Sequence, residues 1–425
     1  MSAELISILV LVVVFVIATT RSINMGALAF AAAFGVGELV ADLDADGIFA
    51  GFPGDLFVVL VGVTYLFAIA RANGTTDWLV HASIRLVRGR IALIPWVMFA
   101  LTGALTAIGA VSPAAVAIVA PIALSFAARY GISPLLMGAL VVHGAQAGGF
   151  SPISIYGSIV NGVVERENLP GNELVLFLAS LFVNLIVAAI VFVLFGGLKL
   201  KGRDLDTEGD GRDKDSADSA LSADASGLTP ARIATLAALA ALVVAVLGFD
   251  LDAGLSAITL AVVLSAFWPD TSRKAVTEVA WPTVLLICGV LTYVGVLEEM
   301  GTIDYAGNAV GDIGVPLLAA VLLCYIAAVI SAFASSVGIM GALIPLAVPF
   351  LAQGEIGAVG MIAALAVSAT VVDVSPFSTN GALVLAAAPD VDRERFFRQL
   401  MVYGGIVVAV VPAAVWLVLV VPGFG

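Results

Sequence analysis

The chain has 425 residues, of which 61% are hydrophobic and only 12% are charged, and its formal net charge is −13. A soluble domain carries about 25% charged residues, so this composition excludes an ordinary soluble fold and makes the lipid bilayer the solvent. The acidic balance argues against nucleic acid as a partner. The two cysteines, Cys288 and Cys324, lie in apolar runs, which excludes a disulfide scaffold or a cysteine-rich metal site.

Apolar runs of about 20 residues predict transmembrane helices. In chain order, the predicted crossings are Leu5–Thr20, Met25–Ala41, Leu56–Ala72, Ser133–Val164, Glu173–Gly197, Ala231–Gly248, Gly254–Trp268, Pro282–Leu297, Gly357–Ala388 and Phe397–Val421. The first run has no basic segment before it, so we interpret it as a retained span rather than a signal peptide. Two longer stretches, Ile91–Ala128 and Val315–Ala352, are interrupted near their middle by small polar residues. Each is expected to form either two crossings or a re-entrant hairpin.

The basic residues fall on one side of this topology. With the N-terminus on side one, 17 of the 18 Lys and Arg residues reach side two, and only Arg166 stays on side one. Lys and Arg favour the cytoplasmic side of a membrane protein. We therefore expect a multi-pass protein of the inner, cytoplasmic membrane, with both termini outside.

Matching motifs recur in the two halves of the chain. Pairs separated by 224 positions are Pro121 and Pro345, Ser151 and Ser375, Ser154 and Ser378, and Gly157 and Gly381, while Gly26 matches Gly254 at an offset of 228. The halves, 1–198 and 230–425, each contain five crossings and one interrupted stretch, so the second half begins on the opposite side and the repeats are predicted to be inverted. Inverted repeats are typical of alternating access, with the substrate near the midplane. The charged segment 199–229 is expected to be a cytoplasmic linker.

The interrupted helices are the candidate binding elements. No His, Cys and carboxylate cluster has catalytic or metal-binding spacing, and no phosphate-binding glycine loop is present, so we expect neither an enzyme nor a resident cofactor. A broken helix exposes amides that attract an anion and carbonyls that suit Na⁺. Hydroxyls and an amide stand at the breaks: Ser112, Ser151, Ser154, Ser335, Ser336, Ser375, Ser378, Thr379 and Asn380. The alternative is a packed kink in which each serine bonds to its own helix.

Asp373 is the one acid deep in a predicted span, two residues before Ser375. An intramembrane carboxylate predicts a function, here as a cation ligand or a proton carrier, with a structural hydrogen bond as the alternative. At the offset of 224 its counterpart is Gly149, so the charge breaks the symmetry of the halves. A lone histidine in an apolar helix, His143, is typical of packing, and Tyr156 is expected either to line the pocket or to pack.

At these residues the chain resembles the ion transporter superfamily, more narrowly the MatC-type malonate/dicarboxylate carriers and more distantly the divalent anion/sodium symporters. The segments 148–152 and 157–161 carry the MatC-like similarity best. The symporters bear a Ser-Asn-Thr motif at each hairpin tip, nine to ten residues before a proline. Here 111–113 and 335–337 stand at that spacing from Pro121 and Pro345 but lack the Asn and Thr.

This resemblance implies two re-entrant hairpins, about ten transmembrane helices around them in an all-α fold, and a homodimer. It also implies that the tips contact both the substrate carboxylate and Na⁺. The substrate residues are then Ser112, Pro113, Ser154, Tyr156, Ser336, Val337, Ser378, Thr379 and Asn380. The Na⁺ ligands are Val111, Ser112, Gly149, Ser151, Ser331, Ser335, Ser336, Asp373 and Ser375.

The sequence thus predicts symport of a small dicarboxylate, such as malonate or a C4-dicarboxylate, coupled to Na⁺ or, alternatively, to H⁺. A cation/proton antiporter or an inorganic-anion exporter on the same scaffold is the competing function. A membrane-embedded enzyme is a third, which the missing catalytic clusters oppose.

Overall fold

The computed structural model describes residues 2–21, 23–84, 90–200, 227–303, 305, 315–332, 336, 339–341, 343–344, 347, 351, 356–389 and 391–423. Every regular element in these ranges is a helix, which confirms the predicted all-α class. The first-half helices are α1 (Ala3–Thr20), α2 (Met25–Leu39), α3 (Ala45–Ala50), α4 (Gly54–Ala72), α5 (Thr75–Ile84), η2 (Ile91–Leu93), α6 (Ile94–Ala107), α7 (Ser112–Tyr130), α8 (Pro134–Gly148), α9 (Ile155–Arg166), α10 (Glu173–Leu194) and η3 (Gly197–Leu200). The second-half helices are α13 (Pro230–Phe249), α14 (Ala253–Phe267), α15 (Pro269–Thr277), α16 (Trp281–Glu299), α18 (Pro316–Ser331), α20 (Ala358–Val371), α21 (Thr379–Ala387), α22 (Arg393–Val415) and η4 (Trp416–Val420).

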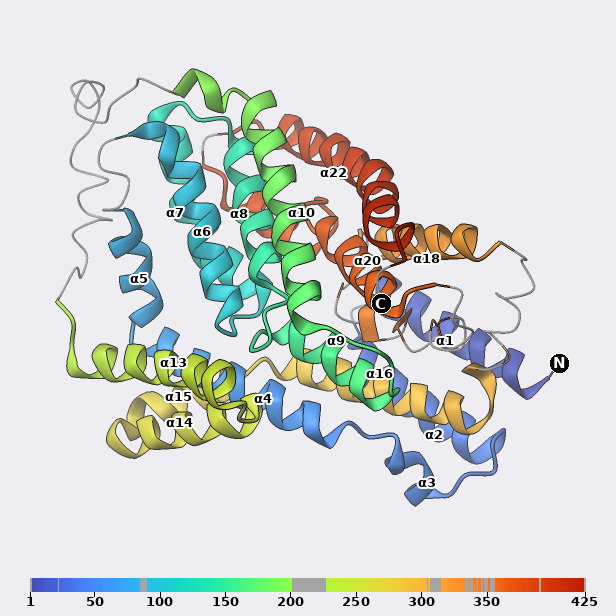
Figure 1. The fold of residues 1–425 in the computed structure, drawn as a ribbon. Coiled ribbons are helices and arrows are strands. Elements are labelled where there is room, and N and C mark those ends of the chain that lie inside the picture. The colour runs from blue at the N-terminus through green and yellow to red at the C-terminus, as the bar shows by residue number, and fades with distance from the viewer. Residues whose placement is uncertain are drawn as a thin grey trace.

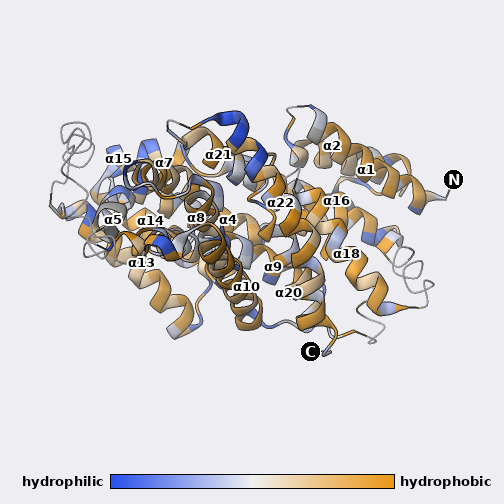
Figure 2. Cartoon of the chain, turned by 90° about the horizontal axis from the view of Figure 1, so that it is seen from above, coloured by the Kyte–Doolittle hydropathy of each residue, from blue (hydrophilic) through white to orange (hydrophobic). Residues whose placement is uncertain are grey.

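The chain is a multi-pass membrane protein by the length and apolarity of its helices. Within the described ranges, six helices are long and apolar enough to cross a bilayer: α4, α7, α10, α13, α16 and α22 with η4. Helix α10 has the apolar surface of a lipid-facing helix, because its large side chains Leu174, Phe182 and Ile190 are 61%, 54% and 52% exposed. Figure 2 shows that hydrophobic residues cover most helices and that hydrophilic residues gather at a few ends, among them α15.

Two groups of helices are visible in Figure 1. Helices α2, α4, α13, α14 and α16 run along the lower part of the view, and α6, α8 and α10 stand steeply above them. Helix α8 packs between α6 and α10, and it is buried along its whole length, from Leu135 to Gly148. A fully buried helix in a membrane protein is a place where polar side chains can face one another away from lipid.

Glycines allow the backbones of two helix pairs, each with one helix from either half of the chain, to touch where the helices cross. Where α2 crosses α16, a Cβ on Gly26 would lie 1.9 Å from the Leu285 carbonyl oxygen, and one on Gly289 would lie 2.0 Å from the Gly26 oxygen. Where α4 crosses α14, a Cβ on Gly62 would lie 2.5 Å from the oxygen of Gly254. Gly26 matches Gly254 at an offset of 228, and Gly62 matches Gly289 at 227, so the two crossings correspond in the way that the predicted repeat requires.

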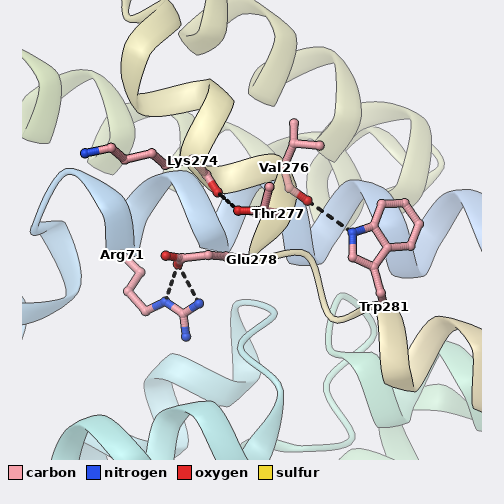
Figure 3. A network of polar contacts seen from close by, with 6 residues as sticks. All are labelled: Arg71, Lys274, Val276, Thr277, Glu278 and Trp281. Carbon is pink, nitrogen blue, oxygen red and sulfur yellow. Dashed lines mark hydrogen bonds and ion pairs between the residues drawn. The ribbon is translucent and has the colours of Figure 1, made fainter. Parts of the chain in front are cut away.

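An ion pair adds a polar contact between the halves at the end of α4. In Figure 3, Arg71 donates from Nε and Nη2 to the Glu278 carboxylate, at 3.0 and 2.6 Å. The same close-up shows Trp281 Nε1 donating to the carbonyl of Val276 at 3.1 Å, which fixes the turn between α15 and α16. The two charged side chains are 39% and 41% exposed, so the pair orients the helices more than it stabilises them.

The helices predicted to be interrupted are broken wherever the structure describes them. The stretch Ile91–Ala128 turns between α6 and α7, where Gly109 has a φ of +115° that suits only glycine. Ser133–Val164 divides into α8 and α9, and Gly357–Ala388 into α20 and α21. The tip of the fourth, Val315–Ala352, lies outside the described residues except for Ser336, and so does most of the predicted linker.

Candidate functional site

The breaks after α8 and α20 are closed by matching serine hydrogen bonds. Ser154 Oγ donates to the carbonyl of Gly149 at 2.5 Å and accepts from the first turn of α9. Ser378 Oγ donates to the carbonyl of Asp373, also at 2.5 Å, and accepts from the first turn of α21. Each serine is therefore an N-cap whose hydroxyl satisfies backbone groups that the break would leave unpaired.

The same two breaks need a glycine three residues after the cap. The Gly157 amide donates to the Gly149 carbonyl at 3.2 Å, and the Gly381 amide donates to the Asp373 carbonyl at 3.0 Å. A Cβ on Gly157 would lie 2.0 Å from the backbone oxygen of Ser151, and one on Gly381 would lie 1.9 Å from that of Ser375. The motif matches at an offset of 224 therefore reflect one backbone structure that occurs twice.

Between these breaks, a buried polar cluster surrounds Asp373, which is 6% exposed. Ser336 Oγ donates to Asp373 Oδ1 at 2.6 Å, and Gln146 Nε2 donates to Oδ2 at 2.8 Å. Asn380 Nδ2 reaches the same Oδ2 at 3.5 Å and donates to Ser112 Oγ at 2.8 Å. Gln146 Nε2 also approaches Ser112 Oγ, at 3.4 Å. Side chains of α8 and α21 thus meet at one carboxylate, and Ser112 of α7 contacts both of them.

Ser112 and Ser336, which the predicted repeat pairs at the offset of 224, both lie in this cluster, 2% and 3% exposed. Ser331 Oγ extends the cluster, because it lies 2.8 Å from Ser336 Oγ and 2.5 Å from the carbonyl of Ala369. Tyr156, buried at 3% exposure, interacts with the Ser112 side chain. The cluster therefore receives matching serines from both halves of the chain.

The hydrogen bonds assign Asp373 the role of an acceptor. The side-chain partners of its carboxylate oxygens are a serine hydroxyl and two amide NH₂ groups, and the NH₂ groups can only donate. Across the described residues, the Lys and Arg ion pairs lie elsewhere, so no basic side chain balances this carboxylate. In the same ranges, no three His, Cys, Asp or Glu residues gather as a metal site. Such a donor set suits an anionic carboxylate.

The structure sorts the residues that the sequence nominated. It brings together Ser112, Tyr156, Ser331, Ser336, Asp373 and Asn380. Other predicted site residues form hydrogen bonds with the backbone instead. Ser151 donates to the Ala107 carbonyl, and Ser375 accepts from the Phe377 amide. Ser154 and Ser378 are N-caps, and the Gly149 carbonyl accepts from Ser154. Thr379 is exposed, and Val111 and Pro113 are half-buried at the start of α7. Ser335 and Val337 lie outside the described residues.

The sequence analysis missed Gln146, although an amide within the apolar helix α8 was a visible signal. His143, one turn earlier, packs as predicted. Its Nδ1 lies 2.9 Å from Asn184 Oδ1, and its Nε2 lies 2.6 Å from the Tyr403 hydroxyl. Asn184 Nδ2 donates to the Ser180 carbonyl, so Oδ1 faces the ring and Nδ1 carries the proton. Both ring nitrogens are therefore used in joining α8 to α10 and α22.

A separate charged pocket of about 340 Å³ lies where α9 and α16 end, lined by Arg166, Glu167 and Glu298 among others. Arg166 donates to the Asp55 carboxylate at 2.8 Å. Burial raises the pKa of Glu167 to about 7, and the charge of Glu298 adds to the rise, while Arg166 opposes it. The pocket therefore holds a carboxyl group that titrates near neutrality.

The comparisons with known proteins concern the first part of this structure. Residues 1–149 match the family model described as the dicarboxylate carrier protein MatC N-terminus. The matched segment contains α1 to α8 and ends at the first break, so it includes Ser112 and Gln146. This match confirms the MatC-type resemblance for that part of the chain. A comparison with curated proteins gave no match.

Proposed function

We propose that the chain is a secondary transporter that carries a small dicarboxylate, such as malonate or a C4-dicarboxylate, by alternating access coupled to Na⁺. The observation that carries the proposal is a buried cluster around Asp373. Ser336 donates to this carboxylate, and Ser112, 224 positions earlier, contacts Gln146 and Asn380, whose amides donate to the same carboxylate. A polar cluster inside a membrane protein is costly and marks a transport site. The match of residues 1–149 to a dicarboxylate carrier family supports the substrate class.

The two halves act as inverted repeats in this proposal, and α6 with α7 forms a re-entrant hairpin. Equivalent glycine crossings and equivalent helix breaks support the repeat. The first-turn amides of α9 and α21 other than those of Gly157 and Gly381, which the breaks already use, are available to an anion that binds beside the cluster. Because no Lys or Arg pairs with the cluster among the described residues, the substrate carboxylates depend on amides, hydroxyls and a bound cation.

The deciding experiment measures uptake of labelled malonate and succinate into proteoliposomes that contain the full chain. Na⁺ and H⁺ gradients are imposed separately, and empty liposomes are the control. We expect Na⁺-driven uptake of at least one of the two dicarboxylates. Uptake that is driven only by the H⁺ gradient would show that H⁺ is the coupling ion in place of Na⁺. No uptake above empty liposomes under either gradient would refute the proposed function.

The proposed orientation has its own test. A cysteine at Ser216, in the predicted cytoplasmic linker, should react only with reagents that enter the cell, and one at Ala45 should react from outside. The native Cys288 and Cys324 are buried, so the unaltered chain is the unlabelled control. Labelling of position 216 by an impermeant reagent in intact cells would show that the orientation is the reverse of the proposed one.

The proposed homodimer is tested separately, by crosslinking of the detergent-purified protein.

A further inference from the structure

Two side-chain oxygens beside Asp373 have no hydrogen-bond partner among the residues that the structure describes. They are Gln146 Oε1 and Asn380 Oδ1, both buried, and both side chains are 0% exposed. Buried polar atoms are nearly always paired, so an unpaired one points to an atom that completes it. Here two such oxygens belong to amides that share the same two neighbours, Ser112 Oγ and Asp373 Oδ2.

The carboxylate fixes which way these amides face. Gln146 approaches Asp373 Oδ2 at 2.8 Å, a hydrogen-bond distance that only the NH₂ end of the amide can satisfy. Turning the amide around would set a carbonyl oxygen against a carboxylate oxygen. The same reasoning holds for Asn380, whose Nδ2 serves both Asp373 and Ser112. Each of the two carbonyl oxygens is therefore bonded to the same carbon atom as an amide nitrogen that contacts Asp373 and Ser112.

We propose that Gln146 Oε1 and Asn380 Oδ1, together with Asp373, bind a single dehydrated Na⁺ between α8 and α21. This inference rests on the proposed function and names the atoms that couple it to the ion. Hard cations take oxygen ligands from carboxylates and amide carbonyls. A substrate carboxylate is not a suitable occupant, because two carbonyl oxygens would repel it. The cation also supplies the balancing charge that Asp373 lacks among the described Lys and Arg residues.

Binding of the ion before the substrate follows from the charges. An ionised Asp373 repels a dicarboxylate until a cation neutralises it, so Na⁺ binds first and the anion second. Gln146 lies in the first half and Asn380 in the second, which makes ion binding dependent on both breaks being in place. This site does not use the predicted Na⁺ ligands Ser151 and Ser375, whose hydroxyls bond to the Ala107 carbonyl and the Phe377 amide.

The test measures Na⁺ binding without substrate. Thermal unfolding of the full chain in detergent is followed while NaCl replaces choline chloride at constant ionic strength. We expect a saturable rise of the midpoint temperature in the wild type. Gln146→Met and Asn380→Leu, which remove the unpaired oxygens, should each weaken the apparent Na⁺ affinity at least tenfold. Asn161→Leu is the matched control, because the unpaired atom of that amide is the nitrogen Nδ2, and its titration should not change.

A second substitution keeps the test decisive if Gln146→Met does not fold. Gln146→Glu keeps an oxygen and adds charge, so its midpoint in choline chloride should fall and its response to Na⁺ should exceed that of the wild type. An equal response of the wild type to Na⁺ and choline, or wild-type titrations for the Met and Leu variants, would overturn the inference and leave only water on these oxygens. The same preparations in liposomes separate the two proposals. If Na⁺ stabilises the protein but neither malonate nor succinate is taken up, the proposed substrate is wrong and the Na⁺ site stands. If H⁺ drives uptake and Na⁺ does not stabilise the protein, the proposed Na⁺ site is wrong and the substrate stands.

Discussion

Adding one methyl group at the α2–α16 crossing should separate the two halves. In Gly26→Ala, the new Cβ would stand 1.9 Å from the Leu285 carbonyl oxygen, whereas real Cβ contacts essentially never fall under 3.0 Å. Backbone cannot rotate away as a side chain can, so the two helices must move apart. Overpacking of this kind costs about 1–3 kcal/mol, and a backbone obstacle places the expected loss near 3 kcal/mol.

Gly35 on the same helix provides the matched control, because a Cβ there would meet nothing within 4 Å. Gly35→Ala should stabilise α2 by about 0.5–1 kcal/mol, as Ala does in a helix interior. The assay is thermal unfolding of both variants in one detergent, with size-exclusion profiles to detect misfolding. Equal midpoints for Gly26→Ala and Gly35→Ala would show that the crossing is looser than the structure has it and would refute the reasoning.

Other substitutions test the cluster and the charged pocket. Ser112→Leu leaves two buried amides without their shared acceptor, so uptake should be lost with a stability cost of about 1–3 kcal/mol; Ser336→Leu should behave alike, and wild-type transport kinetics in both would make these serines merely structural. Asp373→Asn should move the Na⁺ dependence of uptake to higher concentration, whereas uptake that loses only its pH dependence would identify a proton carrier. Glu167 binds its proton more tightly in the folded chain, with a pKa of about 7 against an ordinary 4.5, so its contribution to the free energy of unfolding falls as pH rises through that window. Glu167→Gln should flatten the unfolding profile there, and an unchanged profile would contradict the assignment.

Much of the fold was predictable because lipid imposes a simple pattern. Apolar runs and basic loops placed the helices within a few residues, as α4 at Gly54–Ala72 against the predicted Leu56–Ala72 illustrates. The breaks after α8 and α20 were predictable because Ser-Pro pairs, which disfavour a continuing helix, recur at matched positions. Contacts across the halves were not predictable in this way. Nothing local to Gly26 or Gly289 shows that they touch, since 263 residues separate them.

The candidate site was predictable in its acid and its serines, and less so in how those serines are used. Asp373 was visible as the one acid deep in a span, and Ser112 and Ser336 as equivalent residues at helix breaks. The sequence could not separate them from Ser154 and Ser378, because a hydroxyl that caps a helix and one that faces a site have the same local pattern. Only the fold shows that the caps bond to backbone while Ser112 and Ser336 contact side chains across the halves.

Two of the differences between the breaks after α8 and α20 go together, because the first has Gly149 and Tyr156 where the second has the charged Asp373 and Asn380. In the first break, a Cβ on Gly149 would lie 3.2 Å from Cδ2 of the Tyr156 ring, so any side chain at that position would be tight against the ring. In the second break the equivalents are Asp373 and Asn380, at the same offset of 224. The small amide both makes room for the carboxylate and donates to it, as the 3.5 Å approach of Nδ2 illustrates. A ring with no charge in one half and an amide with a charge in the other are therefore alternative fillings of one loop, and the asymmetry places the charge in the second half and the aromatic ring in the first.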